Sequence, residues 1–442
     1  MKTTYIFLFA ALVASSLTFA QTPCATGRYS TDVYVNITQT NGIQYGQNTT
    51  YTGSNQNLTL DFYQPTGDTA TARPLIIWAH GGSFLGGSST DIDVATLSAR
   101  FAKKGFVCAS INYRLGFFPI DSANSVKAVM RAVQDMKAAI RFFYKDRSTG
   151  TNLYKIDTNN IFIGGSSAGA ITALHCAYLD RTCEINPYVS QTTLTTLGGL
   201  EGNSGNACYS SKVKGVINLC GALARYGWFE AGDLPLCSMH GTADATVKYS
   251  RGMVNPGVPL MYIDGSRMLQ ERATAIGVQH NFYTWYNAPH VPYAGTSAIQ
   301  IAYMDTTVRF VRDYLIQRLG CTDPILQTAN APFGTATLYA YTPCTGNVAQ
   351  TFCTIGIKEH YATNLIQQVF PNPSENEINI VFSSENKKHT IELLDVSGRV
   401  VKSYTSITNT FVVTKDELAQ GIYTLKVSNT EGNYSVHKVL FY

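Results

Sequence analysis

The stretch IFIGGSSAGAITALH, which begins at Ile161, places a short apolar run directly before a helix-forming run, with only small residues between them. When a buried strand turns straight into a helix, the apex residue is forced into a strained backbone conformation, and only small residues fit two positions before and after it. Gly165 and Gly169 hold those positions around Ser167. The stretch therefore predicts a strand, a sharp turn and a helix, with the Ser167 hydroxyl exposed beside the positive end of the helix.

A register shift by one residue is the alternative for this turn. It makes Ser166 the apex and places Ala168, instead of a glycine, two positions after it, so we favour Ser167. A Gly-x-Ser-x-Gly pattern also occurs in ordinary Gly/Ser-rich loops. The rest of the chain must therefore supply the residues that would make this serine reactive.

The segment around this turn alternates apolar runs with helical patterns. After Pro74 the apolar runs are LIIWAH, FVCASINY, IFIGG, VKGVINLCG, PLCSMHG and HNFYTWYN, and the helical patterns cover residues 95–104, 126–144, 267–276, one stretch from residue 168 and one ending near residue 319. Such alternation is typical of a mainly parallel sheet with helices on both faces. Residues 34–62 alternate apolar and polar side chains around turn residues, which predicts an antiparallel hairpin before that sheet.

The last 74 residues differ in kind from the rest of the chain. VFPNPSENEINIVF, HTIELLDVSGRVV, FVVTKDEL, GIYTLKVSN and YSVHKVLFY are short alternating segments separated by turn residues. This pattern predicts a small all-β sandwich. The fold class is therefore α/β followed by all-β. We expect a signal peptide at residues 1–20, the α/β domain at 21–320, a cysteine-containing connector at 321–368 and the β-sandwich at 369–442.

The first 20 residues, MKTTYIFLFAALVASSLTFA, combine one lysine, a short apolar core and small residues before Gln21. They predict a cleavable secretory signal peptide. A membrane span is the alternative, but it needs about 20 apolar residues with flanking anchors. We therefore expect export through the periplasm, a secreted or cell-surface location and no stable membrane insertion.

Charge and cysteine content narrow the choice of partners. The chain has 33 Lys and Arg against 29 Asp and Glu, a formal net charge of +4, and no basic run, so no nucleic-acid partner is indicated. In an exported protein, ten cysteines without a CxxC or Cys/His cluster favour disulfides over a metal site. Spacing does not fix their pairing, and Cys108, inside the apolar run GFVCASINY, is alternatively a buried free thiol.

A serine hydroxyl becomes a good nucleophile only when a histidine takes its proton, and that histidine needs a carboxylate to fix its tautomer. In strand-turn-helix nucleophiles the chain order is serine, acid, histidine. Downstream of Ser167, the run PLCSMHG ends in GTADATV, which contains Asp244, and HNFYTWYN ends in APHVPY, which contains His290. Both lie at carboxyl ends of predicted strands, where the active sites of open parallel sheets form. Ser167, Asp244 and His290 are therefore the predicted catalytic residues.

Other acids and histidines fit less well. Asp233 precedes its strand, and Asp264 begins a turn before a helix, where a capping role is expected. His175 lies in the helix behind the serine, His240 precedes Asp244 in the same turn, and His280 opens a strand. The remaining downstream histidines belong to the connector or to the C-terminal segment.

A tetrahedral oxyanion also needs backbone donors. The run LIIWAHGGSFLGG supplies a strand followed by glycines that let the backbone approach a substrate carbonyl. We expect the amides of Gly82, Ser83 and Ala168 to form the oxyanion hole, each worth roughly 3 kcal/mol of barrier. A simple turn is the alternative interpretation.

The Gly/Ser/Thr/Asn-rich segment from Asn186 to Ser211 is either a surface loop or a lid over the site.

Residues from about Leu58 to Leu319 resemble α/β-hydrolases of the carboxylesterase/lipase group, akin to the hormone-sensitive-lipase-like and type B families. The motifs that carry the resemblance are HGGSF, INYRLGFF, AVQDMKAAIRFF, IDTNNIFIGGSSAGA, HGTADATV and APHVPY. It implies Ser167 as nucleophile, His290 as base, Asp244 as acid and a carboxylic-ester substrate, with no cofactor or metal. Ser83 departs from it, because it replaces the third glycine of an HGGG motif.

The C-terminal segment resembles the sorting domain that Bacteroidetes attach to type IX secretion cargo, through FPNP, DVSGRVV, GIYTLKV and VHKVLFY. This resemblance implies the type IX secretion machinery as a partner. A carbohydrate-binding or adhesive β-domain is the alternative.

The sequence thus predicts a secreted serine esterase that removes acetyl or feruloyl groups from plant polysaccharide. Phe84, Phe117 and Trp228 are the predicted substrate-binding side chains, although all three are equally suited to an ordinary core. The alternatives are a polyester or lipid esterase, a prolyl-oligopeptidase-like serine peptidase, and a surface binding protein on a hydrolase scaffold without catalysis. The peptidase is disfavoured because no propeller domain accompanies the chain.

Overall fold

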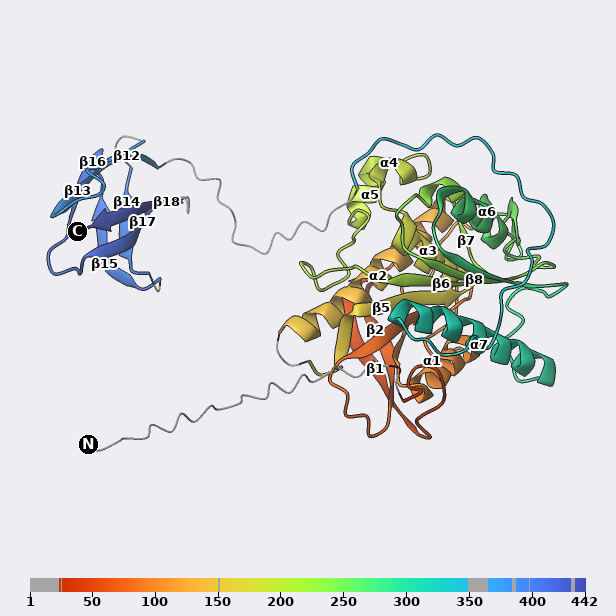
Figure 1. Cartoon of the computed structure of the whole chain (residues 1–442). Helices are drawn as coiled ribbons and strands as arrows, with labels where there is room; N and C mark the ends of the chain where they lie inside the picture. Colours follow the sequence, from red (N-terminus) through yellow and green to blue (C-terminus); the bar gives the residue numbers. More distant parts are fainter. Residues whose placement is uncertain are drawn as a thin grey trace, which may run out of the picture. The chain divides into compact units, whose positions relative to one another are not determined.

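The computed structural model describes residues 24, 26–149, 152–348, 365–383, 387–396, 398–430 and 434–442. Two compact units make up the chain, Met1–Cys353 and Thr354–Tyr442 (Figure 1). Their division falls inside the predicted connector. The predicted signal peptide at residues 1–20 and Cys353 lie outside the described residues.

An eight-stranded sheet forms the centre of the first unit. Its strands are β1 (Ile37–Thr49), β2 (Asn55–Pro65), β3 (Arg73–Ala79), β4 (Val107–Ile111), β5 (Ile156–Ser166), β6 (Gly215–Leu219), β8 (Leu236–Gly241) and β11 (His280–Trp285). They are ordered β1-β2-β4-β3-β5-β6-β8-β11, and all neighbours from β4 to β11 pair in parallel. The predicted hairpin is β1 and β2, which pair antiparallel, and β2 pairs antiparallel with β4.

Helices cover both faces of this sheet (Figure 1). They are α1 (Ile92–Lys103), α2 (Ser122–Ser148), α3 (Ala168–Tyr178), α4 (Thr182–Ile185), α5 (Gln191–Leu197), α6 (Ser266–Ile276) and α7 (Ala298–Leu319), with a 3-10 turn at Tyr226–Trp228. The short strands β7 (Ala222–Leu223), β9 (Arg251–Met253) and β10 (Tyr262–Gly265) form a separate small sheet. The mainly parallel sheet with helices on both faces, which the alternating runs predicted, is confirmed.

The two faces of the sheet carry separate cores because side chains alternate along each strand. On β3, Leu75 and Ile77 belong to the core that packs against α2 and α3, whereas Ile76 and Trp78 belong to the core beneath α1 and α7. All four side chains are fully buried. A continuous apolar run such as LIIWAH therefore reflects burial on both faces, as expected of a parallel strand.

After α7 the chain crosses the surface of the first unit as a strap, residues 321–348, which contains little regular structure. Disulfides Cys24–Cys321 and Cys183–Cys344 hold the strap to the unit, and Cys208 is also disulfide-bonded. Between the disulfides, the Asn330 side chain both accepts the N–H of Thr284 (2.7 Å) and donates to its carbonyl oxygen (2.8 Å) on the edge strand β11. The prediction of a stapled segment is confirmed for this part of the connector.

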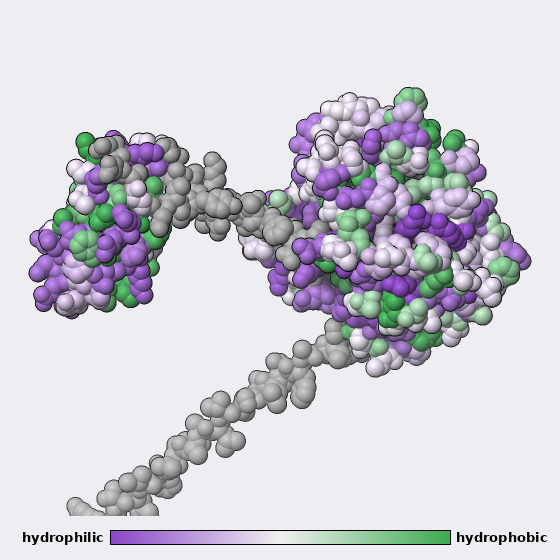
Figure 2. Space-filling view, turned by 90° about the horizontal axis from the view of Figure 1, so that it is seen from above, coloured by the Kyte–Doolittle hydropathy of each residue, from purple (hydrophilic) through white to green (hydrophobic). Residues whose placement is uncertain are grey.

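Four cysteines of the described chain carry free thiols: Cys108, Cys176, Cys220 and Cys237. Cys108 is fully buried, which matches the alternative reading of the run GFVCASINY. Hydrophilic and hydrophobic residues are interspersed over the face of the first unit shown in Figure 2. Among the described helices, none combines the length and apolarity needed to cross a membrane.

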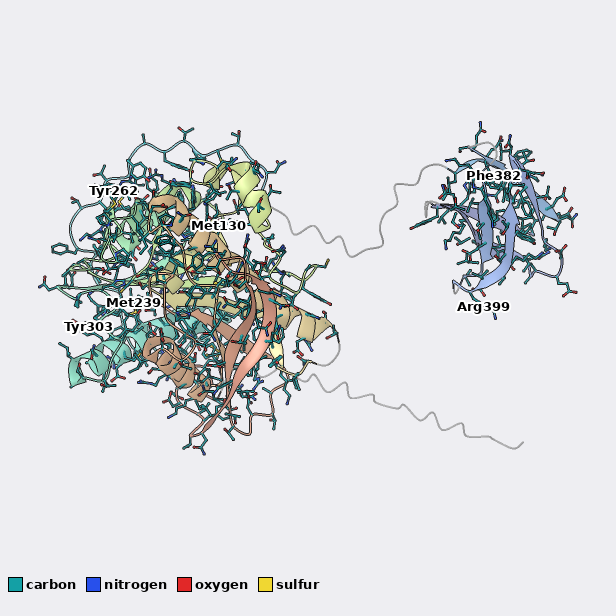
Figure 3. All side chains as sticks on the ribbon, turned by 180° about the vertical axis from the view of Figure 1, so that it is seen from behind. Met130, Met239, Tyr262, Tyr303, Phe382 and Arg399 are labelled. Atoms are coloured by element: carbon teal, nitrogen blue, oxygen red, sulfur yellow. A yellow bond between two sulfur atoms is a disulfide. The ribbon has the colours of Figure 1, made fainter. Side chains whose placement is uncertain are left out.

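The second unit consists of two antiparallel sheets, as predicted. One contains β12 (Ile366–Phe370), β13 (Glu377–Phe382) and β16 (Thr410–Thr414), and the other contains β14 (His389–Leu394), β15 (Val400–Ser406), β17 (Gly421–Asn429) and β18 (Tyr434–Phe441). Ile378, Ile380, Leu393 and Leu425 are fully buried in one core, and Phe382, labelled in Figure 3, joins them. Strand β12 begins two residues before the end of the predicted connector.

Candidate active site

The predicted turn after β5 is present, and Ser167 is its apex. Ser167 has backbone angles φ 54° and ψ −115° and directly precedes α3. A Cβ on Gly165 would lie 2.3 Å from the carbonyl carbon of Gly169, and one on Gly169 would lie 1.9 Å from the carbonyl oxygen of Ala79. Both positions therefore exclude any larger residue, which is the physical reason for the small residues around this serine.

Three side chains from distant parts of the chain meet at this turn. The Ser167 Oγ lies 2.7 Å from His290 Nε2, and His290 Nδ1 lies 2.6 Å from Asp244 Oδ2. Asp244 follows β8 and His290 follows β11, so both lie at carboxyl ends of adjacent parallel strands. The structure thus brings together all three residues that were predicted as catalytic.

The Asp244 carboxylate is buried and fully hydrogen-bonded. Its Oδ1 accepts the N–H groups of Thr246 and Val247, both at 2.9 Å. Its Oδ2 accepts from His290 and also from His240 Nε2 at 3.1 Å. Burial alone would raise the pKa of Asp244, but the hydrogen bonds from the two histidines hold it below its ordinary value. The carboxylate is therefore ionised and can fix the orientation of His290.

The loop after β3 lies against the serine. A Cβ on Gly81 would lie 3.4 Å from the Ser167 Cβ, and one on Gly82 would lie 2.1 Å from the carbonyl oxygen of Gly86. Gly82 and Ser83 both have positive φ, 100° and 57°. Within the described residues, the amides of Gly82, Ser83 and Ala168 donate to no other protein group. These amides are therefore available to a ligand beside Ser167.

Tyr113 supports this loop from the core side. Its hydroxyl donates to the His80 carbonyl oxygen at 2.8 Å, and its ring stacks on the His80 imidazole with the centroids 4.4 Å apart. Burial lowers the pKa of His80, which is thus neutral and donates through Nδ1 to the Gly81 carbonyl oxygen. The loop conformation is therefore set by buried contacts on its far side.

An apolar cavity opens beside Ser167. Its walls come from α2, α3, the α4 region and the segment between β8 and β10: Val126, Val129, Ile171, Ile185, Tyr188, Trp228, Val247, Val254, Leu260, Met261 and Ile263. Most of these residues carry no hydrogen-bonding side chain. The cavity can therefore hold an apolar group attached to a carbonyl at Ser167.

A second depression that also reaches Ser167 is an open groove. Polar groups line much of it, including Asp91, Asp93, Asn255, Thr246 and the glycine backbone of the loop after β3. His290 and Ser167 are among its lining residues. We call these two depressions the apolar cavity and the polar groove.

The three predicted substrate-binding aromatics lie in different places. Phe84 and Trp228 line the apolar cavity. Phe117 is 3% exposed and packs in the core, and it is not among the residues that line either depression. Its flanking Phe118 is exposed instead. An aromatic side chain alone does not reveal whether its face meets a cavity or the core, which is why sequence reasoning misplaced Phe117.

The segment from Asn186 to Ser211 contains the helix α5 and is tied to α2. Gln134 donates to the Gly199 carbonyl oxygen, Arg141 to the Gly205 carbonyl oxygen, and Lys137 forms an ion pair of 2.6 Å with Glu201. The part around residues 199–205 is thus fixed by buried cations of α2. Tyr188, at the start of the segment, lines the apolar cavity, so this end forms a wall of the site.

The expected capping role of Asp264 is wrong. Gly265 is the residue that precedes α6, and no side chain caps that helix end. The buried Asp264 carboxylate instead accepts the Tyr226 N–H and the Tyr339 hydroxyl and pairs with Arg251 at 2.8 Å. It joins the strap to the first unit.

His175 and His240 are both buried near the site, and neither contacts Ser167. His175 donates through Nδ1 to the Ile171 carbonyl oxygen and accepts the Ala224 N–H at Nε2. Burial lowers the pKa of His175 to about 4. It therefore supports the cavity wall as a neutral side chain. Sequence reasoning missed the contact of His240 with Asp244, although their spacing of four residues around one strand end is a signal for it.

Comparisons with known proteins match both units. The BD-FAE family model matches residues 60–224, and the secretion system C-terminal sorting domain model matches residues 368–441. Carboxylesterase 3B of Mus musculus is 35% identical over 116 residues, which are 26% of this chain and 19% of that protein. Gut esterase 1 of Caenorhabditis elegans is 31% identical over 115 residues, also 26% of this chain and 19% of that protein. The chain thus spans about a fifth of the length of these curated relatives.

Among solved structures, the Thermogutta terrifontis esterase 2 phosphorylated by paraoxon matches at 20% identity with a TM-score of 0.47, covering 63% of this chain and 94% of that one. The first unit thus has a helix-covered, mainly parallel sheet and resembles the BD-FAE family and carboxylesterases over part of its length. The second unit matches the secretion system C-terminal sorting domain model over most of its length, which indicates export to the cell surface or the exterior.

Proposed function

We propose that the chain is a secreted serine hydrolase of carboxylic esters. The observation that carries this proposal is the unbroken series of hydrogen bonds from Asp244 through His290 to the Ser167 hydroxyl. That arrangement suits proton transfer from the serine to the histidine, with the carboxylate holding the tautomer. The matches to esterases agree with an ester as substrate.

In the proposed reaction, His290 Nε2 takes the proton of Ser167 as Oγ attacks the ester carbonyl carbon. The amides of Gly82, Ser83 and Ala168 receive the oxyanion, which they can do because no protein group occupies them in the described chain. His290 then gives its proton to the departing alcohol oxygen. Water repeats the sequence on the acyl-enzyme and releases the acid.

The two depressions suggest how the substrate lies. The acyl group enters the apolar cavity, and the alcohol leaves through the more open polar groove. The apolar lining of this cavity, which includes the rings of Phe84, Tyr188 and Trp228, suits an aromatic acyl group such as feruloyl better than acetyl. A polar groove open to solvent suits a sugar alcohol within a polymer. The substrate we propose is therefore an aromatic acyl ester of a plant polysaccharide.

The test combines active-site labelling with turnover. A fluorophosphonate should label Ser167 in the wild type and should not label Ser167→Ala, whose kcat should fall by roughly 10⁴-fold or more. Turnover is then compared on methyl ferulate, acetylated xylan, nitrophenyl esters of increasing acyl length and a peptide anilide. Absence of label would favour a non-catalytic binding protein, and anilide cleavage would favour a peptidase. A preference for long alkyl chains over ferulate would favour lipid or polyester cleavage.

A further inference from the structure

A second histidine touches the carboxylate of the triad. His240, at the end of β8, is fully buried, and its Nε2 lies 3.1 Å from Asp244 Oδ2. The same oxygen accepts from His290 Nδ1 at 2.6 Å. Two imidazole rings from different strand ends therefore share one carboxylate oxygen.

The surroundings of His240 fix where its proton lies. Nε2 is also 2.9 Å from the Val247 carbonyl oxygen, which can only accept. Because both neighbours of Nε2 are acceptors, Nε2 must carry a hydrogen. Nδ1, 2.8 Å from Ser266 Oγ, then accepts the serine hydroxyl in the neutral ring.

The hydrogen bonds of Asn218 fix the donor and acceptor roles of Ser266. Asn218 Nδ2 donates to Ser266 Oγ at 2.9 Å and also to Ser238 Oγ, and its Oδ1 accepts the Gly221 N–H. These bonds fix the orientation of the Asn218 amide. Because Ser266 Oγ accepts from that amide, its hydroxyl hydrogen can be donated to His240 Nδ1. The network is buried and every polar group in it has a partner, as expected of one that specifies a single geometry.

From these contacts we infer that His240 is a positioning residue for the proposed reaction: it donates to Asp244 Oδ2, fixes the rotamer of that carboxylate and limits the negative charge that His290 meets. The inference rests on the proposed function. Without the His240 donor, Oδ2 would interact more strongly with protonated His290, so His290 would become more basic. It would also lose the constraint that aims its ring at Ser167.

Other ionisable groups face this cluster. The Cys220 thiol, the Asp244 carboxylate and His290 lie within 4.8 Å of one another, and the Tyr249 ring is 5.8 Å from that of His240. Burial raises the pKa of Cys220 and of Tyr249, so both are neutral at working pH. These two groups, and Asp93 on the groove side, are present in every variant below.

The experiment compares His240→Leu, His240→Gln and Ser266→Ala with the wild type in the full exported chain. His240→Leu should lower kcat/KM for the best ester by roughly 100-fold. The acid limb of its kcat/KM profile should move to higher pH by roughly half to one unit. His240→Gln keeps an N–H donor at similar reach and should restore most of the rate and the limb. Ser266→Ala should shift the limb in the same direction by less.

A merely structural role would lower the rate or the melting temperature without moving the acid limb. An unmoved limb in His240→Leu, or a His240→Gln variant as impaired as His240→Leu, would overturn the inference. If His240→Leu does not fold, the acid limbs of the kcat/KM profiles of His240→Gln and Ser266→Ala test the inference instead. The His290 pKa is also read directly by NMR in each variant, which tests His240 even if the wild type cleaves no ester and the proposed function fails.

Discussion

The apolar cavity and the polar groove meet at Ser167 and differ in almost every respect. The cavity is lined by aliphatic and aromatic side chains from α2, α3 and the β8–β10 segment, while the groove is more open and is lined by carboxylates and glycine backbone. An apolar wall selects by shape, since a group that fits gains burial and one that does not fit clashes. An open polar wall selects more weakly, by charge and hydrogen bonding. Acyl specificity should therefore be stricter than alcohol specificity.

The largest expected effect comes from the disulfide behind the apolar cavity. Cys183 lies on α4 beside Ile185, a wall residue, and bonds to Cys344 of the strap. Replacing both cysteines by serine should lower the free energy of unfolding by about 2–4 kcal/mol. It should also loosen the wall and flatten the dependence of kcat/KM on acyl length, measured on a nitrophenyl ester series.

The matched control for that variant is Cys24→Ser with Cys321→Ser, which removes a disulfide that touches neither depression. Chemical denaturation should show a comparable loss of stability, with acyl preference unchanged. An equal change of acyl preference in both variants would contradict the role of α4 as a cavity wall.

Filling the cavity should separate the two depressions. Val129 on α2 lines the cavity. Val129→Trp should lower kcat/KM for methyl ferulate and for long acyl chains by roughly 100-fold, while acetate esters change only a few-fold, because the added ring occupies the acyl space. Val129→Ala enlarges the same space and serves as the control, with the opposite trend. Equal losses on acetate and ferulate would place the acyl group elsewhere.

Glu184 gives the cavity wall a pH-dependent stability. Burial raises the pKa of its carboxyl to about 7, although it accepts the N–H groups of Asp180 and Arg181. Between an unfolded pKa of about 4.5 and the folded value, the folded chain keeps a proton that the unfolded chain has lost, so stability falls as pH rises through this window.

Glu184→Gln stays neutral at every pH. Its free energy of unfolding relative to the wild type should therefore rise from pH 5 to pH 8, by an amount on the order of 1 kcal/mol, which chemical denaturation at each pH measures. Glu184→Asp retains a titrating carboxyl and is the control. A constant difference between Glu184→Gln and the wild type across this range would show that Glu184 is ionised in the folded chain.

The smallest effect is expected on the groove side. Asp91 precedes α1, makes no helix-capping bond and has a side chain that is 39% exposed. It should repel a substrate whose alcohol carries a carboxylate, so Asp91→Asn should improve kcat/KM for such an ester about 2- to 5-fold, with little change for its neutral analogue. High salt should reduce the difference. The control is Asp305→Asn on α7, because Asp305 lines neither depression. This variant should leave kcat/KM unchanged for both esters.

The fold and the meeting of Ser167, Asp244 and His290 could be predicted because local sequence encodes them. A Cβ on Gly165 or Gly169 would lie less than 2.5 Å from a backbone atom, so both positions require glycine. Asp244 and His290 follow two predicted strands, so the periodicity of the sequence places them at one edge of the sheet. The disulfide partners and the cavity walls depend on long-range packing. Cys183 and Cys344 are 161 residues apart, and no local pattern predicts their meeting.

The Phe117 and Asp264 predictions failed for the same reason. Phe117 follows the apolar run of β4 by a few residues and packs inward, whereas the sequence gives only an aromatic near a loop. Asp264 has the local setting of a capping residue, but a strap more than 70 residues further along the chain supplies Tyr339 as its partner. Side chains that serve contacts between remote segments are the ones that sequence reasoning misassigns.

The contact between Asn330 and β11 has a consequence for a protein that must stay dissolved outside the cell. Strand β11 is the last strand of the sheet, so one side of its backbone faces no further strand. Such an exposed edge strand can pair with the edge strand of another molecule and start aggregation. The Asn330 amide satisfies both the N–H and the C=O of Thr284, so these two backbone groups are not available to hydrogen-bond a strand of another molecule.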